Sequence, residues 1–220
     1  MQQGIIGMPN DKKLFIHIPK TGGISIRRNQ KTNKHILKPP HSLVKEPYRL
    51  ETKKMYSDYR MWWHWKCIDW PPQYINEYKT FAIIRNPWDR KASQYYYTLK
   101  RNYKEYNSFE EFLESRNQIT IRNHMNPYMS WTTQYDYVVN HDRKITTDIL
   151  RFENYDEDVN LYFNLSKNVK PSNVTGSNEG SYKDIYTPET IQIVADWYKK
   201  DIDYWGYDFD TGATRNYWNA

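Results

Sequence analysis

The amino-acid sequence predicts an α/β fold with a central parallel sheet, and two observations lead to this prediction. Short apolar runs alternate along the chain with segments that have helical features. Parallel strands need long crossover connections, which helices usually supply, so this alternation favours a parallel sheet. Two of the apolar runs are also followed by turns with basic residues, and open α/β sheets bind ligands beyond the carboxyl ends of their strands. We therefore expect a P-loop-like, three-layer α/β/α arrangement in a single domain over residues 1–220.

The first predicted strand covers residues 14–18, and the turn after it carries the chemistry of an anion site. Residues 19–25 read Pro-Lys-Thr-Gly-Gly-Ile-Ser. Glycines let backbone N–H groups approach an anion closely, and a helix that begins there directs its positive end to the same point. Lys20 adds a mobile charge, while Thr21 and Ser25 add hydroxyl donors. We interpret this segment as a strand–loop–helix phosphate site. It is not a Walker A loop, because the lysine precedes the glycines.

The remaining elements are predicted from apolar runs, capping signals and helix breakers. Ser108 and Glu111 have the spacing of a capping box, so a helix is expected from Phe109. Thr-Pro-Glu at residues 187–189 marks the start of a last helix. An irregular basic loop is expected at 31–50. The aromatic segment at 56–70 has an ambiguous period, and a helix is expected there. The other expected elements are strands at 80–85 and 147–152 and helices at 88–101 and from 155, and the last helix ends near 204. No element is predicted for residues 117–143.

Composition and charge limit the classes of protein to which this chain belongs. A chain of 220 residues with 17% aromatic residues can bury a substantial core, so disorder is not expected. The net charge of +6 fits an anionic ligand and fits simple solubility as well. The single cysteine, Cys67, excludes an intrachain disulfide and favours a reducing compartment. We find no apolar run long enough to span a membrane and no signal-peptide pattern, and we expect a cytoplasmic protein.

A second basic turn follows the second predicted strand. Residues 85–93 read Arg-Asn-Pro-Trp-Asp-Arg-Lys-Ala-Ser. Arg85 can bind phosphate oxygens in a bidentate manner, and Ser93 can donate a hydrogen bond from the following helix. Because both turns follow strands of one sheet, we expect them at the same edge, where together they would hold two phosphate groups. For this segment alone, the alternative is that Arg85 and Arg90 pair with Asp89 and with solvent.

The two basic turns together resemble the phosphosulfate-binding signatures of the sulfotransferases. The similarity is greatest to the carbohydrate branch, which includes heparan and chondroitin sulfotransferases and bacterial relatives. Residues 150–158, Leu-Arg-Phe-Glu-Asn-Tyr-Asp-Glu-Asp, resemble a strand and helix of that family. Residues 182–190 and 198–209 resemble its C-terminal end. The resemblance therefore covers most of the chain.

The resemblance implies the donor 3′-phosphoadenosine 5′-phosphosulfate (PAPS) and assigns residues to its two ends. The residues implied to hold the 5′-phosphosulfate are Lys20, Thr21, Gly22, Gly23 and Ser25. Arg85 and Ser93 are implied to hold the 3′-phosphate, and Tyr182 and Lys183 lie in a segment that closes over the nucleotide. Ile24 departs from the family, which usually has Thr or Ser there, so we expect weaker donor binding.

Sulfuryl transfer is an in-line displacement, so catalysis should come mainly from positioning and charge stabilisation. We expect Lys20 to stabilise the leaving phosphate oxygen. The acceptor hydroxyl also needs a general base. His41 is the first candidate, because carbohydrate relatives often carry a histidine there; His64 and Glu46 follow, and His17 is expected to be structural. No spacing of His or Cys residues indicates a metal site, and this chemistry needs no metal.

The expected acceptor is a hydroxyl group of a carbohydrate or glycan, including an anionic one. His64, Trp131 and Gln134 are candidate acceptor contacts, although aromatic residues are more often part of the core. Basic residues between 27 and 54 fit an anionic polysaccharide and a solvated loop equally well. Three alternatives remain: a kinase-like P-loop protein, which the missing Walker A motif disfavours; a catalytically silent nucleotide-binding relative; and a basic module for single-stranded nucleic acid. We expect no nucleic-acid partner.

Overall fold

A three-stranded parallel sheet lies at the centre of the computed structural model, which describes residues 12–38, 64–100, 106–115, 131–166, 169 and 181–215. The strands are β1 (Leu14–Ile16), β2 (Thr80–Ile84) and β3 (Asp148–Arg151), in the order β1-β2-β3. Phe15 pairs with Phe81, and Ala82 pairs with Ile149, both in parallel register. The predicted α/β architecture with a parallel sheet is confirmed.

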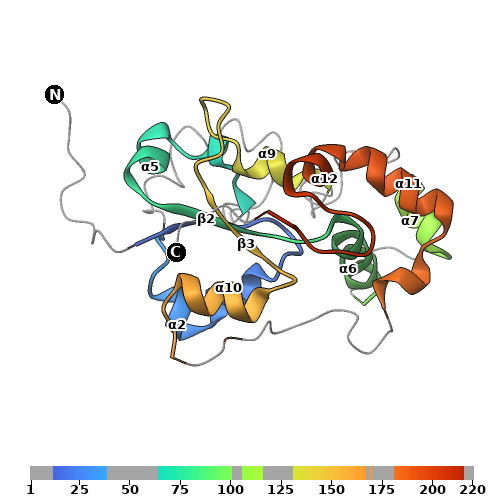
Figure 1. The fold of residues 1–220 in the computed structure, drawn as a ribbon, viewed down its shortest axis with the longest axis horizontal. Helices are drawn as coiled ribbons and strands as arrows, with labels where there is room; N and C mark the ends of the chain where they lie inside the picture. The colour runs from blue at the N-terminus through green and yellow to red at the C-terminus, as the bar shows by residue number, and fades with distance from the viewer. Residues whose placement is uncertain are drawn as a thin grey trace.

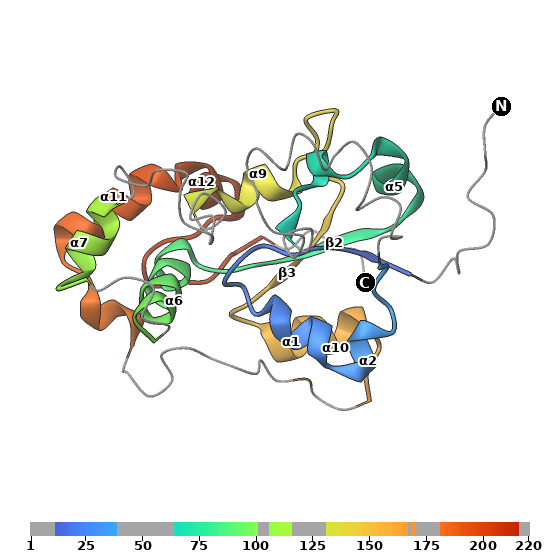
Figure 2. The same cartoon turned by 180° about the vertical axis from the view of Figure 1, so that it is seen from behind.

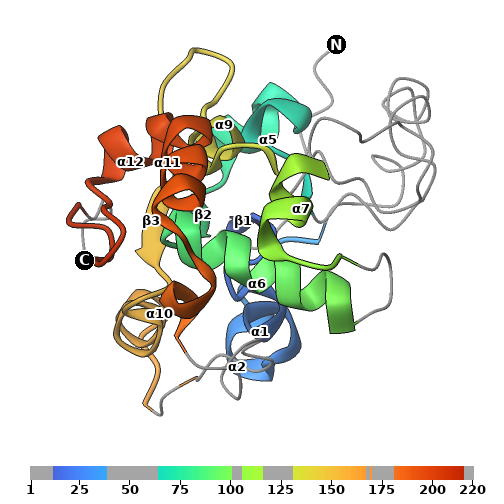
Figure 3. The same ribbon diagram turned by 90° about the vertical axis from the view of Figure 1, so that its right-hand side faces the viewer.

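Helices cover both faces of the sheet (Figure 1). One face carries α1 (Gly23–Arg28), α2 (Gln30–Asn33) and α10 (Tyr155–Tyr162), as the view from behind also shows (Figure 2). The opposite side carries α5 (Pro72–Glu77), α9 (Gln134–Val138), α11 (Pro188–Trp197) and α12 (Lys199–Trp205). Figure 3 views the molecule from the end at which α6 (Pro87–Lys100), α7 (Phe109–Glu114) and α11 lie.

The two faces of the sheet have separate cores because side chains alternate along a strand. Phe15 and Phe81 stack on the α1 and α10 side, with ring centroids 4.7 Å apart. Leu14 and Ile16 face the other side, where they pack with the aromatic residues of α5, α9 and α12. All five residues of β2 are buried, as expected for the central strand of a parallel sheet. No helix of the described residues is long and apolar enough to cross a membrane.

Several predicted boundaries need correction. The strands are shorter than their apolar runs, since His17 and Ile18 already belong to the turn after β1. Residues 31–33 of the predicted basic loop belong to α2. The side chain of Asn29 caps this helix by accepting a hydrogen bond from the N–H group of Lys31. The helix predicted at 56–70 is wrong in its described part: residues 67–69 form a 3₁₀ turn, η2 (Cys67–Asp69), and Pro72 then starts α5.

The later helices are predicted more closely. The hydroxyl of Ser108 accepts a hydrogen bond from the N–H group of Glu111, and α7 begins at Phe109 as expected. The last predicted helix is divided into α11 and α12, because Tyr198 leaves helical geometry at φ −112° and ψ 22°. The short helix α9 lies in a region for which the sequence predicts no element, and the side chain of Thr133 caps it.

Candidate active site

The first loop, which we define as residues 17–22, joins β1 to α1 and adopts an unusual backbone. Lys20 has φ 70°, a left-handed conformation that is uncommon for a residue with a side chain. Gly22 follows with φ 81°. The hydroxyl of Thr21 donates a hydrogen bond to the carbonyl of Ile18 at 2.9 Å and so closes the turn. The loop is therefore a tight turn whose shape depends on specific residues.

The two glycines of this segment are required for different reasons. A Cβ atom on Gly22 would lie 2.9 Å from the Phe152 ring, and its positive φ would also be strained. A Cβ atom on Gly23 would lie 2.2 Å from Cδ2 and 2.3 Å from Nε2 of His17. Small residues at these two positions thus let the loop pack closely against β1 and the segment after β3. The structure thus requires both glycines for packing within the protein, and their role in an anion site stays a prediction.

The second turn, Arg85 and Asn86, meets the first loop directly. The guanidinium of Arg85 donates to the carbonyl of Lys20 at 3.2 Å. It also makes two hydrogen bonds of 2.7 Å to the Asp89 carboxylate and lies 4.0 Å from the centroid of the Phe152 ring. Arg85 is only 6% exposed. The structure therefore brings the two basic turns together, and it also contains the Arg85–Asp89 pair that was the alternative interpretation of the sequence.

Arg90 is a further contact between the two turns, and sequence reasoning gave it no part in the site. Its guanidinium donates to the carbonyl of Pro19 and to the carbonyl of Thr132, both at 3.0 Å. Arg90 is 2% exposed. Arg85 and Arg90 thus bind two consecutive carbonyl groups of the first loop, and α6 fixes the position of that loop. The Arg-x-x-x-x-Arg spacing from the second turn into α6 was the available signal.

The side chain of Lys20 extends toward α6. Its ammonium lies 4.1 Å from the centroid of the Tyr97 ring, within the range of a cation–π interaction. Ser93, on the same helix, is buried. Ser25, in α1, is also buried. Residues predicted to hold the two ends of one nucleotide therefore come from neighbouring elements, β1–α1 and β2–α6.

The segment after β3 contributes Glu153, which sequence reasoning did not select although it lies in the matched segment at 150–158. Its carboxylate accepts a hydrogen bond from the N–H group of Asn86. Burial of this carboxylate, with a smaller effect of nearby Asp89, raises the pKa of Glu153 to about 7, although the residue as a whole is exposed. The N–H group of Asn86 and the charge of Arg85 act in the opposite direction.

Tyr182 and Lys183 contact the C-terminal segment, which we define as residues 208–211. They belong to the 3₁₀ helix η4 (Tyr182–Ile185). The Tyr182 hydroxyl donates to the carbonyl of Phe209, and Lys183 forms an ion pair with Asp210. The amide of Asn86 in turn donates to the carbonyls of Asp208 and Thr211, each at 2.9 Å. The C-terminal segment therefore connects η4 to the second turn.

The candidate acceptor contacts lie in three different environments. His64 places Nδ1 2.8 Å from the carbonyl oxygen of His17, and the two rings are 4.3 Å apart. Gln134 is fully buried, and its amide makes two hydrogen bonds of 2.8 Å with the backbone of Arg85. Trp131 is buried against Phe112, with ring centroids 5.5 Å apart. Gln134 and Trp131 thus have buried partners in the structure, and the role of all three residues as acceptor contacts stays a prediction.

Both histidines of this pair are neutral near pH 7. Burial lowers the pKa of His64 to about 4, with Arg27 and Arg90 acting in the same direction. Burial, His64 and Arg27 hold the pKa of His17 well below its ordinary value. A base with a pKa this low is weak at neutral pH, which favours another residue as general base. The candidates His41 and Glu46 lie outside the described residues, so their roles stay predictions.

Within the described ranges, no group of His, Cys, Asp and Glu residues is arranged to hold a metal ion. Cys67 is buried, with its sulfur 3.4 Å from the Thr147 hydroxyl. Burial raises the pKa of the Cys67 thiol to about 12, so it is an inert core residue at neutral pH.

The model of the sulfotransferase family matches residues 3–208. This range includes both basic turns, the segment after β3 and most of the C-terminal part of the chain. No curated protein matches the chain.

Proposed function

Since the chain belongs to the sulfotransferase family, we propose that it transfers a sulfuryl group from PAPS to a hydroxyl group of a carbohydrate or glycan. Family membership supports sulfuryl transfer in general. The donor and the acceptor class are inferred from the residues and from their resemblance to the carbohydrate branch. The observation that carries the proposal is the convergence of the two basic turns, in which Arg85 and Arg90 bind consecutive carbonyls of the first loop.

The residues of the first loop fit the 5′ end of PAPS. Gly22 has a positive φ and Gly23 begins α1, so backbone N–H groups at this point can be directed to a phosphate. Thr21 fixes the turn through its hydrogen bond to the Ile18 carbonyl, and Ser25 supplies a hydroxyl group near the start of α1. Bound PAPS supplies an activated sulfuryl group with a phosphate as leaving group. Lys20 neutralises the charge that develops on that leaving phosphate, and His41 removes the proton from the acceptor hydroxyl.

The residues of the second turn fit the 3′-phosphate of PAPS if Arg85 can bind a phosphate and Asp89 at the same time. Arg85 is already paired with Asp89, so a phosphate must share this guanidinium with a carboxylate. Like charges that share one site repel each other, which weakens binding. Ser93, Tyr182 and Lys183 complete the proposed nucleotide site.

The Arg85–Asp89 pair also favours a second candidate function, a relative that binds nucleotide weakly and is catalytically silent. Calorimetric titration with 3′-phosphoadenosine 5′-phosphate tests nucleotide binding, and micromolar affinity supports both functions. Transfer of ³⁵S from labelled PAPS to a panel of sugars, polysaccharides, lipids and phenols separates them. A protein that binds an oligonucleotide tightly and does not bind the bisphosphate would contradict both.

The role of Lys20 is tested by Lys20→Ala. Turnover is expected to fall by two or more orders of magnitude, because a positioned charge on a leaving group contributes about 3–4 kcal/mol to catalysis. Bisphosphate affinity should change much less than turnover. Lys31→Ala, which removes an exposed lysine of α2, is the matched control and should retain full turnover. Near-normal turnover of Lys20→Ala would exclude this role.

A further inference from the structure

The side-chain amide of Gln134 pairs with both backbone polar groups of Arg85. Its Oε1 atom accepts a hydrogen bond from the Arg85 N–H group, and its Nε2 atom donates to the Arg85 carbonyl, each at 2.8 Å. Gln134 is 0% exposed, so water does not compete for these hydrogen bonds. Because hydrogen bonds are directional, two of them from one planar group fix both the position and the orientation of the Arg85 backbone.

This amide takes the place of a neighbouring strand at the end of β2. The ladder between β1 and β2 extends only as far as Ala82. On the side of β3, the N–H group of Phe152 still donates to the carbonyl of Ile84 at 2.8 Å. Buried backbone groups need partners, and for Arg85 the side chain of Gln134 supplies a partner to each group.

Gln134 is itself held between two helices. It is the first residue of α9. Asp201 of α12, which is fully buried, accepts hydrogen bonds from the N–H groups of Gln134 and Tyr135 at 2.9 Å and 2.8 Å. Arg90 of α6 donates to the carbonyl of Thr132 at 3.0 Å. The start of α9 is thus tied to α6 and to α12, and it gives the second turn a rigid support.

The guanidinium of Arg85 belongs to the proposed site for the 3′-phosphate. It contacts the Asp89 carboxylate at 2.7 Å and the carbonyl of Lys20 at 3.2 Å, and its side chain is 7% exposed. A guanidinium binds a phosphate in a bidentate manner only where its plane faces the oxygen atoms. A shift of the Arg85 backbone would turn this plane, so the phosphate-binding geometry depends on the two hydrogen bonds from Gln134.

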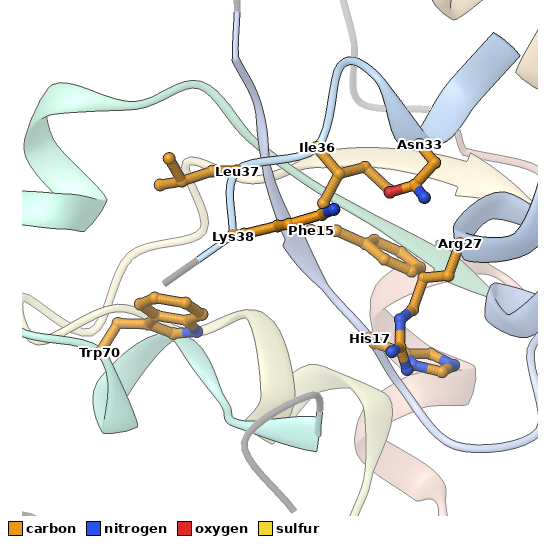
Figure 4. Close-up of a pocket in the computed structure, with 8 residues that line it drawn as sticks. All are labelled: Phe15, His17, Arg27, Asn33, Ile36, Leu37, Lys38 and Trp70. Atoms are coloured by element: carbon orange, nitrogen blue, oxygen red, sulfur yellow. The ribbon is translucent and has the colours of Figure 1, made fainter. Parts of the chain in front are cut away.

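The cavity beside β1 lies apart from this arrangement. It has a volume of about 330 Å³, and Phe15, His17 and Trp70 are among the residues that line it (Figure 4). Neither Gln134 nor Arg85 belongs to its lining. A ligand in this cavity would therefore not explain the hydrogen bonds between Gln134 and the second turn.

We propose that Gln134 is a positioning residue of the nucleotide site, which holds Arg85 in the geometry that binds the 3′-phosphate of the donor. The inference rests on the proposed function and adds to it a residue that does not touch the nucleotide. Selectivity for a nucleotide with a 3′-phosphate then depends on a buried side chain at the start of α9.

Calorimetric titration of the full-length protein compares two probes, 3′-phosphoadenosine 5′-phosphate and adenosine 5′-phosphate, which lacks the 3′-phosphate. Wild type is expected to bind the bisphosphate at least about tenfold more tightly. Gln134→Met keeps the length of the side chain and removes both hydrogen bonds. It should reduce the preference to about threefold or less and change the affinity for adenosine 5′-phosphate less than twofold. A wild-type preference in this variant would overturn the proposal.

Gln134→Asn is a second variant, which keeps a polar amide and withdraws it by one methylene group from the Arg85 backbone. It should reduce the preference as well. Thr80→Val is the matched control for a loss of stability, because it removes a buried hydrogen bond to the Thr147 hydroxyl at the other end of β2. It should leave the preference within twofold of wild type. An equal loss of preference in Thr80→Val and Gln134→Met would attribute the effect to loosening of the fold and refute the positioning role.

A double-mutant cycle shows whether Gln134 acts through Arg85. Arg85→Met alone should weaken binding of the bisphosphate, and the addition of Gln134→Met should weaken it less than twofold further, because the group that Gln134 positions is already gone. A further loss of twofold or more would mean that Gln134 affects the nucleotide by another route, contrary to the proposal.

The same titrations separate this inference from the proposed function. Equal binding of the two nucleotides by wild type would contradict the 3′-phosphate site, and the proposed donor would fail together with this inference. A wild-type preference that both Gln134 variants retain would overturn the inference alone. Absence of sulfuryl transfer, with the expected effects on nucleotide binding, would contradict the proposed transfer and leave the role of Gln134 standing, since the titrations need no acceptor.

Discussion

At the scale of single residues, the contact between His17 and Gly23 shows how closely the first loop is packed. A methyl group on Gly23 would have to displace the His17 ring, which is itself held between Phe15 and His64. The ring cannot move aside freely, because protein interiors are packed at nearly crystalline density. The sequence identified Gly23 for its nearness to an anion, and the structure adds this steric requirement.

Gly23→Ala is therefore expected to lower the free energy of unfolding by about 1–3 kcal/mol, the usual cost of overpacking. Urea denaturation measures the change. Lys31→Ala, at an exposed position of α2, is the control, since it adds no contact and removes no buried group. This control should change stability by about 0.5 kcal/mol or less. Equal effects of the two substitutions would contradict the steric argument.

The buried histidines predict a dependence of stability on pH. His64 is neutral in the folded protein down to about pH 4, whereas in the unfolded chain it binds a proton near pH 6.5. Below pH 6.5 the unfolded state therefore holds more protons, so His64 lowers stability as the pH falls. The stability that neutral His64 contributes is present in full above pH 6.5, and up to about 3 kcal/mol of it is lost by pH 4.

The comparison of wild type with His64→Gln isolates this effect. Asp201, whose pKa burial raises to about 6, and Glu153 act in the opposite direction and are common to both proteins. The stability difference between variant and wild type should shift in favour of the variant between pH 6.5 and pH 4.5. Urea denaturation at several pH values measures it, and parallel curves for the two proteins would refute the assignment of a depressed pKa to His64.

At the scale of elements, the second turn and α6 hold the first loop through one arginine each, Arg85 and Arg90. Arg90 is the more buried of the two, and its two carbonyl partners, on Pro19 and Thr132, come from two other parts of the chain. Periodicity identifies α6 as a helix, but it does not reveal which carbonyl groups the two arginines reach. Those partners depend on the placement of β1 next to β2.

Arg90→Met is expected to lower the free energy of unfolding by about 1–3 kcal/mol, because the buried carbonyl of Pro19 loses its guanidinium donor. It should also weaken bisphosphate binding, since the first loop loses its support. Thermal denaturation and calorimetric titration measure the two effects. Lys100→Met, at the exposed end of the same helix, should change stability by about 0.5 kcal/mol or less. A stable Arg90→Met protein with normal nucleotide affinity would show that the loop keeps its shape unaided.

At the scale of the whole molecule, β2 is the central element. It pairs with both other strands, and each of its residues is buried between the two cores. The most protected amides in a protein lie in elements with the most buried apolar contacts. The amides of β2 should therefore exchange with solvent more slowly than those of α2, a short helix at the edge of the sheet. Native-state hydrogen exchange followed by NMR measures this, and faster exchange in β2 than in α2 would contradict the proposed core.

The sequence by itself determined the parallel α/β architecture, the starts of α7, α10 and α11, and the residues of both basic turns. These features depend on local signals: apolar runs, capping residues, prolines and glycines act within a few positions of themselves. Tertiary structure decided which residues of the site are paired. Arg85 binds the carbonyl of Lys20, Arg90 binds the carbonyl of Pro19, and Gln134 binds the backbone of Arg85. Those contacts join residues distant in the chain, so burial and hydrogen bonding across the folded sheet fix them, and no local pattern encodes them.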